Sequence, residues 1–310
     1  MAMTQANFRK IVMLAEAPDA AEASVVYLRE KMSSFLKQNE RVLILFRKEE
    51  RASCRILEQA IEACGAIAIW LGEDCRWMTM LKTAFKERSS CLVGSPLTIL
   101  GLSKLSKQMQ IPLYVKNVMM SGYPTTAWMV EGVRKNLDCM AWGCFDPGDG
   151  AVIGGFTCKQ LDGAHVRSDV YTVEIEDEDG NLQPEGKSDR VVVYPNSDPA
   201  LRFAVGDRGR LDTSACSCGN PEPKLVDMDV IKAGNEDLSV LGESLHCWSS
   251  ILDCRLEKTE CGMELELVVF PGEKLPKLPT VAKQIIRPFD PEKDVPFEHR
   301  KELKKRFLTE

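Results

Sequence analysis

The sequence predicts an α/β fold in three parts. These are a parallel-sheet α/β subdomain (residues 1–150), a distorted β-barrel-like subdomain (151–228) and a short α+β domain with a basic tail (229–310). In the first half, short apolar runs alternate with segments that carry apolar residues at helical spacing. This alternation is typical of right-handed βαβ units and a parallel sheet. After residue 150, short strand-like segments are separated by turn residues instead.

The predicted parallel strands are nearly uninterrupted apolar runs, as expected of strands covered by helices on both faces. They span residues 41–47, 66–72, 90–96, 112–122 and 138–144. Helices are expected over residues 25–36, 50–64, 97–108 and 125–137, the last beginning at a Thr cap, and around Trp77, Leu81 and Phe85. Ligands of such sheets bind at the carboxyl ends of the strands, so residues 121–124 and 142–150 are the expected binding region.

The second half has less periodicity. Residues 177–181, Asp-Glu-Asp-Gly-Asn, predict a hairpin turn within the β-rich section. Residues 229–271 are expected to form a helix and two strands. The tail is rich in proline and charge and is expected to end in a short basic helix.

Composition excludes several classes of protein. The chain has 310 residues, is 44% hydrophobic and carries a net charge of −6, which argues against nucleic-acid binding. No apolar run approaches the ~20 residues that cross a bilayer, and the N-terminus lacks an apolar signal core, so we expect a cytoplasmic protein. Its 12 cysteines are then expected to be reduced. A nucleophilic Cys144, at a predicted strand end, is a minor alternative.

A Cys-x-Cys-Gly motif is the most specific local feature. Cys216 and Cys218 lie one residue apart before a glycine, and their sulfurs can converge on one metal ion. Cys158 and His165 lie upstream in the same β-rich section. Together they offer the four ligands of a structural zinc site. The spacing alone leaves open that these are four unconnected reduced side chains.

Five segments, taken in order, resemble the phenylacetate–CoA ligase branch of the adenylate-forming (AMP-binding) enzymes. They are residues 121–137, 142–150, 156–186, 205–225 and 234–253, and the likeness runs from about residue 41 to 271. The resemblance implies the fold of these enzymes, shortened. It also implies a structural zinc ion held by the residues that match the family's ligands, Cys158, His165, Cys216 and Cys218.

The resemblance further implies AMP or ATP and CoA as ligands. Asp207 matches the family aspartate that binds the ribose hydroxyls, although a simple turn residue is the alternative. Asp146 is in register with the family glutamate that binds magnesium, and a loop aspartate before a proline is its alternative. The other nucleotide-site candidates flank the two strand ends: Ser121, Gly122, Tyr123, Trp142 and Gly143.

Four departures from the family pattern bear on catalysis. The sequence contains no Ser/Thr/Gly-rich phosphate loop, and Asp146 replaces a glutamate. Asn235 replaces the hinge arginine, while Asp237 matches the acid beside it. Lys304 and Lys305 lack the glycine-rich surroundings of the family's catalytic lysine.

We therefore expect a degenerate relative that binds a small acyl, aryl or adenylate ligand, or that joins a partner protein supplying the phosphate loop. One alternative is an active acid–thiol ligase, or an acyl transferase that accepts a pre-activated substrate. Another is a structural protein, for example one that dimerises through its sheet. Enzymatic activity itself stays open at this point.

Overall fold

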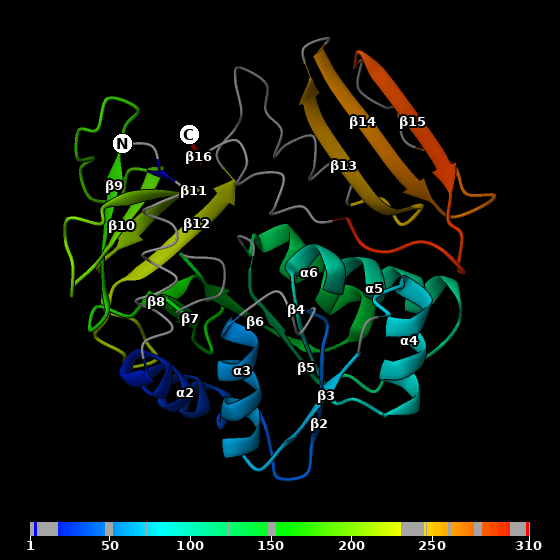
Figure 1. Cartoon of the computed structure of the whole chain (residues 1–310), viewed down its shortest axis with the longest axis horizontal. Helices are drawn as coiled ribbons and strands as arrows, with labels where there is room; N and C mark the ends of the chain where they lie inside the picture. Colours follow the sequence, from blue (N-terminus) through cyan, green and yellow to red (C-terminus); the bar gives the residue numbers. More distant parts are fainter. Residues whose placement is uncertain are drawn as a thin grey trace.

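The computed structural model describes residues 3–4, 18–46, 52–71, 74–122, 125–147, 153–230, 245, 247–259, 262–275, 281–297 and 308–309. Its main feature is a single eleven-stranded sheet with the order β3-β2-β4-β5-β6-β7-β8-β12-β11-β10-β9 (Figure 1). The sheet is parallel in its first half and antiparallel in its second. The predicted α/β class is confirmed.

The parallel half alternates strands and helices as the sequence predicts. Its strands are β2 (Arg41–Ile44), β3 (Ile67–Trp70), β4 (Cys91–Gly94), β5 (Asn117–Met120) and β6 (Met140–Phe145). Its helices are α2 (Pro18–Met32), α3 (Ala52–Ala63), α4 (Trp77–Lys86), α5 (Pro96–Gln108) and α6 (Ala127–Leu137). Ser95 begins α5, because its Oγ accepts the Thr98 amide at 3.2 Å and Pro96 follows it. The cap of α6 is Thr126, one residue later than predicted for that helix.

Two hydrophobic cores cover the two faces of the parallel strands. Helices α2 and α3 pack on one face against side chains such as Val42 and Ile44. Helices α4, α5 and α6 pack on the other face against Leu43 and Leu92. Successive residues of β2 therefore point into opposite cores, as the pleat of a strand requires. This explains why the strands are apolar at nearly every position.

The antiparallel half has a core of its own. Its strands are β7 (Gly155–Thr157), β8 (Ala164–Val166), β9 (Tyr171–Glu176), β10 (Asp189–Pro195), β11 (Phe203–Asp212) and β12 (Lys224–Val230). Tyr171, Val191 and Leu225 are buried there. The predicted hairpin turn lies between β9 and β10, where the Asn181 amide donates to Asp177 Oδ1 at 2.8 Å.

A separate three-stranded sheet packs over α4 and α5 (Figure 1). It contains β13 (Ile251–Thr259), β14 (Gly262–Val269) and β15 (Lys283–Pro288). Leu252, Val268 and Phe289 join the same core as Trp77 on α4. The Trp77 amide also donates to the Asp294 carbonyl at 3.0 Å. This sheet is thus built into the body of the molecule.

The helices and strands predicted for the C-terminal part of the chain agree with the structure in part. Strands β13 and β14 are the two that the sequence predicts, whereas β15 falls in a stretch where proline and charge hid its short apolar run. The predicted helix before β13 and the basic helix at the end lie outside the described residues, apart from Leu245. Short strands β1 (Met3–Thr4) and β16 (Leu308–Thr309) pair in parallel. Among the described helices, none combines the length and the apolar character needed to cross a bilayer.

Gly101 on α5 tests the packing of the C-terminal sheet. A Cβ at this position would lie 2.4 Å from Trp77 Cη2 and 3.2 Å from the Leu252 carbonyl oxygen. We expect Gly101→Ala to lower the free energy of unfolding by about 1–3 kcal/mol, because overpacking of a rigid core outweighs alanine's better helix propensity. The matched control is Gly132→Ala on α6, whose Cβ would meet only the mobile end of Leu100. Equal stability of both variants in urea denaturation would contradict this packing.

Lys104 links α5 to β13 and gives a pH-dependent test. It is buried, and its Nζ donates to the Ile251 carbonyl at 2.9 Å. Burial lowers its pKa from 10.5 to about 8, against the opposing effect of Cys254, Asp253 and Cys247. Between these two pH values the unfolded chain binds more protons at this site, so the contribution of Lys104 to stability rises with pH.

We therefore expect the wild type to gain stability relative to Lys104→Met as the pH rises from 8 to 10.5. The difference in unfolding free energy should change by up to about 3 kcal/mol. Urea denaturation of both proteins across this range measures it, and buried cysteines and tyrosines cancel in the comparison. A difference that does not vary with pH would be inconsistent with a buried, deprotonating Lys104.

Candidate functional site

A cavity of about 800 Å³ opens at the carboxyl end of β6. One wall is helix α6, and the opposite wall is formed by β11 and β12. The loop between β7 and β8 contributes a third side through residues 160–163. The cavity thus lies where the parallel strands give way to the antiparallel ones, at a strand carboxyl end as predicted.

Three of the predicted nucleotide-site residues line this cavity. Gly143 and Asp146 reach it from the end of β6, and Asp207 reaches it from β11. The two carboxylates are nearly buried, with exposed fractions of 4% for Asp146 and 6% for Asp207. Buried acids at a cavity surface are suited to bind hydroxyl groups or a cation.

Other predicted residues lie elsewhere. Ser121, Gly122 and Trp142 are not among the described residues that line the cavity. The Trp142 ring stacks on Phe35 at 4.8 Å between centroids, and its Nε1 donates to Asn117 Oδ1 at 3.1 Å. It faces the α2–α3 core because its neighbour Gly143 takes the cavity side of the strand. Tyr123 lies outside the described residues.

Cys144 is poorly suited to act as a nucleophile. Its side chain is buried, and burial together with the nearby Asp146 carboxylate raises the pKa of the thiol well above its usual value. The nucleophile in cysteine chemistry is the thiolate, which this environment disfavours. The residue therefore lines the cavity only as a small apolar side chain that also packs in the α2–α3 core.

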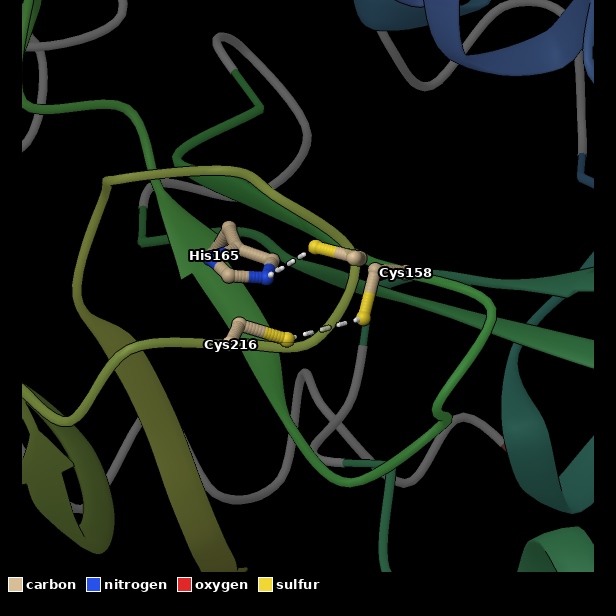
Figure 2. Close-up of side chains that lie close together, drawn as sticks. Cys158, His165 and Cys216 are labelled. Atoms are coloured by element: carbon tan, nitrogen blue, oxygen red, sulfur yellow. Dashed lines mark hydrogen bonds between the residues drawn. The ribbon is translucent and has the colours of Figure 1, made fainter.

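Figure 2 shows a Cys–His cluster, two members of which, Cys158 and His165, flank the cavity-lining residues 160–164. Ligand atoms of Cys158, His165, Cys216 and Cys218 all lie within 4.8 Å of one another. Cys158 Sγ is 3.8 Å from Cys216 Sγ, and Cys218 Sγ is 3.3 Å from His165 Nε2. The edges of a tetrahedral zinc site with sulfur and imidazole ligands are about 3.5–3.8 Å long, so the four residues fit such an ion.

The backbone orients each ligand of this cluster. His165 Nδ1 lies 2.7 Å from the Glu222 carbonyl oxygen, which makes Nδ1 the protonated nitrogen and leaves Nε2 free to bind a metal. The Gly219 amide donates to the Cys216 carbonyl at 3.0 Å and closes the turn that holds both cysteines of the motif. Cys158 follows β7, and His165 lies within β8. The fold therefore brings together four residues that are up to 60 positions apart, counted from Cys158 to Cys218.

The thiols differ in their ease of ionisation. Burial raises the pKa of Cys158 to about 11, although the Gln160 amide opposes this. The pKa of Cys218 is lowered, because hydrogen bonds from the Asn220 amide and the two neighbouring thiols outweigh desolvation. A bound cation would favour the thiolate form of all three cysteines in the cluster.

The loop between Cys158 and His165 was not predicted to belong to the site. Gln160, Leu161, Asp162 and Gly163 line the cavity. Thr157, just before the loop, also lines it and accepts the Gly143 amide at 2.9 Å. The sequence did contain a signal: two ligands of one metal that bracket a short segment require that segment to fold back on itself.

Comparison with known proteins identifies structures that share this fold, but no sequence relative. No protein-family model matches the sequence. No curated protein matches it either. A solved 2-hydroxyisobutyryl-CoA ligase, in the postadenylation state with an acyl-AMP, matches with a TM-score of 0.63 and 15% identity over 80% of this chain.

Two further ligases match in the same way. A benzoate CoA ligase from Burkholderia xenovorans has a TM-score of 0.58 at 10% identity over 86% of this chain. An anthranilate CoA ligase in complex with anthranoyl-AMP has a TM-score of 0.57 at 11% identity over 91%. The chain spans 58%, 62% and 63% of the lengths of these three structures. It therefore shares the fold of these CoA ligases over the part of their length that it spans.

Proposed function

We propose that this protein binds a small acyl, aryl or adenylate ligand in the cavity at the end of β6. The observation that carries this proposal is the joint presence of Asp146 and Asp207, both nearly buried, in one cavity of about 800 Å³. This volume is within the usual range for small-molecule sites. In this proposal the Asp207 carboxylate accepts hydrogen bonds from the two ribose hydroxyls of an adenylate.

The fold supports an adenylate as the ligand class. Two of the three structural neighbours described above were solved with an acyl-AMP or aryl-AMP bound. The cavity also contains apolar surface from Phe145, Leu225 and Val226, which suits an acyl or aryl group. CoA is the second ligand that the resemblance suggests.

We further propose that this chain does not complete ATP-dependent ligation by itself. The 310 residues contain no Ser/Thr/Gly-rich phosphate loop, and the position of the family's magnesium-binding glutamate is occupied by Asp146. Loss of a single preorganised hydrogen-bond donor that stabilises the negative charge of the transition state lowers the rate about 10²-fold or more. A partner polypeptide that supplies such a loop would restore the reaction.

An active ligase or acyl transferase is the second candidate, because the two acids at one cavity also suit catalysis. ATP–pyrophosphate exchange distinguishes the active ligase from the degenerate relative, and transfer of the acyl group from a supplied acyl adenylate to CoA would identify the transferase. Exchange that depends on a carboxylic acid would favour the active enzyme. Binding of AMP without exchange would favour the degenerate relative. A purely structural role is less well supported, since the described residues form a strand-end cavity that is lined by two nearly buried acids.

We also propose that the Cys–His cluster holds a structural zinc ion. Cys158, Cys216 and Cys218 would bind it through thiolates, and His165 through Nε2. The ion would supply folding energy by joining the β7–β8 loop to the turn after β11. It takes no part in chemistry at the cavity.

Replacement of Asp207 tests the ligand site. We expect Asp207→Asn to weaken AMP binding tenfold or more, since hydrogen bonds to a charged group contribute about 1.5–3 kcal/mol each. Isothermal titration calorimetry measures the affinity, and circular dichroism checks the fold. The matched control is Asp179→Asn, an exposed residue of the β9–β10 turn. The proposal fails if the wild type does not bind AMP or if both variants bind it equally.

Replacement of Cys216 tests the metal site. We expect elemental analysis to find about one zinc ion per chain in the wild type, and Cys216→Ser to lose both the ion and several kcal/mol of stability. The control is Cys247→Ser, an exposed cysteine outside the cluster, which should keep the metal and the melting temperature. Wild-type protein that contains no zinc and takes up none when zinc is added would rule the site out.

A further inference from the structure

The loop between β7 and β8 belongs to both sites at once. Two metal-ligand candidates, Cys158 and His165, stand at its two ends. The residues between them that line the cavity are Gln160, Leu161, Asp162, Gly163 and Ala164. Whatever fixes the ends of this loop therefore also sets the position of one cavity wall.

The loop has a backbone that is costly to form. Leu161 has a φ of +57°, a left-handed conformation that side-chain-bearing residues avoid. Gly163 has a φ of +130°, and a Cβ there would lie 2.4 Å from Val226 Cγ1. The loop thus lies tightly on β12 in a conformation that persists only when its surroundings hold it.

Lys224 connects the cluster to the cavity from the other side. Its Nζ lies 2.7 Å from Asp162 Oδ2 and 3.4 Å from Asp212 Oδ2, and both acids line the cavity. Its own side chain is only 6% exposed. In the sheet Lys224 is opposite His165 on one side and Asp212 on the other. Two residues before it, the Glu222 carbonyl oxygen orients His165.

We infer that metal binding at the Cys–His cluster sets the shape of the ligand cavity, with Lys224 as a positioning residue between them. This inference rests on the proposed adenylate site. The bound metal would hold both ends of the loop, and Lys224 would hold its middle through Asp162. Loss of the metal would release the strained loop and widen the cavity on the side that this loop forms.

Thermodynamic linkage makes this coupling reciprocal. If the metal strengthens binding of an adenylate by some factor, the adenylate strengthens binding of the metal by the same factor. Couplings between two sites in one protein are commonly about 5- to 150-fold. We expect about tenfold here, because one of the cavity's sides depends on the loop.

The first experiment compares zinc-loaded protein with protein stripped by a chelator. Hydrogen–deuterium exchange is measured over residues 159–164, with β4 and β5 as internal references. Calorimetry measures AMP affinity in both forms and zinc affinity with and without AMP. We expect faster exchange in the loop alone, AMP binding about tenfold weaker after stripping, and zinc binding tighter by the same factor when AMP is present.

The second experiment keeps the metal and removes the link. Lys224→Met should retain one zinc ion, show faster exchange in residues 159–164 and bind AMP several-fold more weakly. Lys224→Arg keeps the positive charge and should restore much of the affinity. The control is Lys187→Met, an exposed residue of the loop between β9 and β10.

The outcomes separate this inference from the proposed function. Unchanged exchange in the loop after metal removal, with AMP bound equally well by both forms, would overturn the coupling and leave the adenylate site standing. If metal removal speeds exchange in the loop but neither the zinc-loaded nor the stripped protein binds AMP, the metal does fix the position of the loop and the adenylate site is overturned. Equal effects of the methionine substitutions at Lys224 and Lys187 would overturn the role of Lys224.

Discussion

Strand β6 is the constraint on which the rest of the structure depends. It pairs in parallel with β5 from Met140 to Gly143, and then in antiparallel with β7 at Cys144 and Phe145. This change of partner within one strand joins the two halves of the sheet. It also leaves the end of β6 without a parallel neighbour, and the cavity opens there. The position of the cavity thus follows from a single change of pairing.

The sequence predicted most of the fold because its strongest signals are local. Apolar runs separated by amphipathic segments located all five parallel strands and the helices between them. The Cys-x-Cys-Gly motif pointed to a cluster that the structure brings together. By contrast, β15 was missed because its two isoleucines, Ile285 and Ile286, are both exposed and lie among charges and proline. Strand residues without a buried face carry no hydrophobic pattern to detect.

The site was predicted less completely, for a geometric reason. Motif position pointed to Gly143, Asp146 and Asp207, which line the cavity, but not to the neighbours that face the same way. Trp142 was expected at the ligand, yet its ring packs on Phe35 because adjacent strand residues point to opposite faces. The β7–β8 loop became visible as a cavity wall only once the register of β8 with β12 was known. Sequence patterns predict elements well and the contacts between distant elements poorly.

Placement of an adenylate in the strand-end cavity is the central claim, and a crystal structure of the zinc-loaded protein soaked with AMP tests it most directly. We predict electron density for AMP in the cavity, with the ribose hydroxyls within hydrogen-bonding distance of the Asp207 carboxylate. Density for AMP at another surface, or an empty cavity at saturating AMP, would contradict the claim.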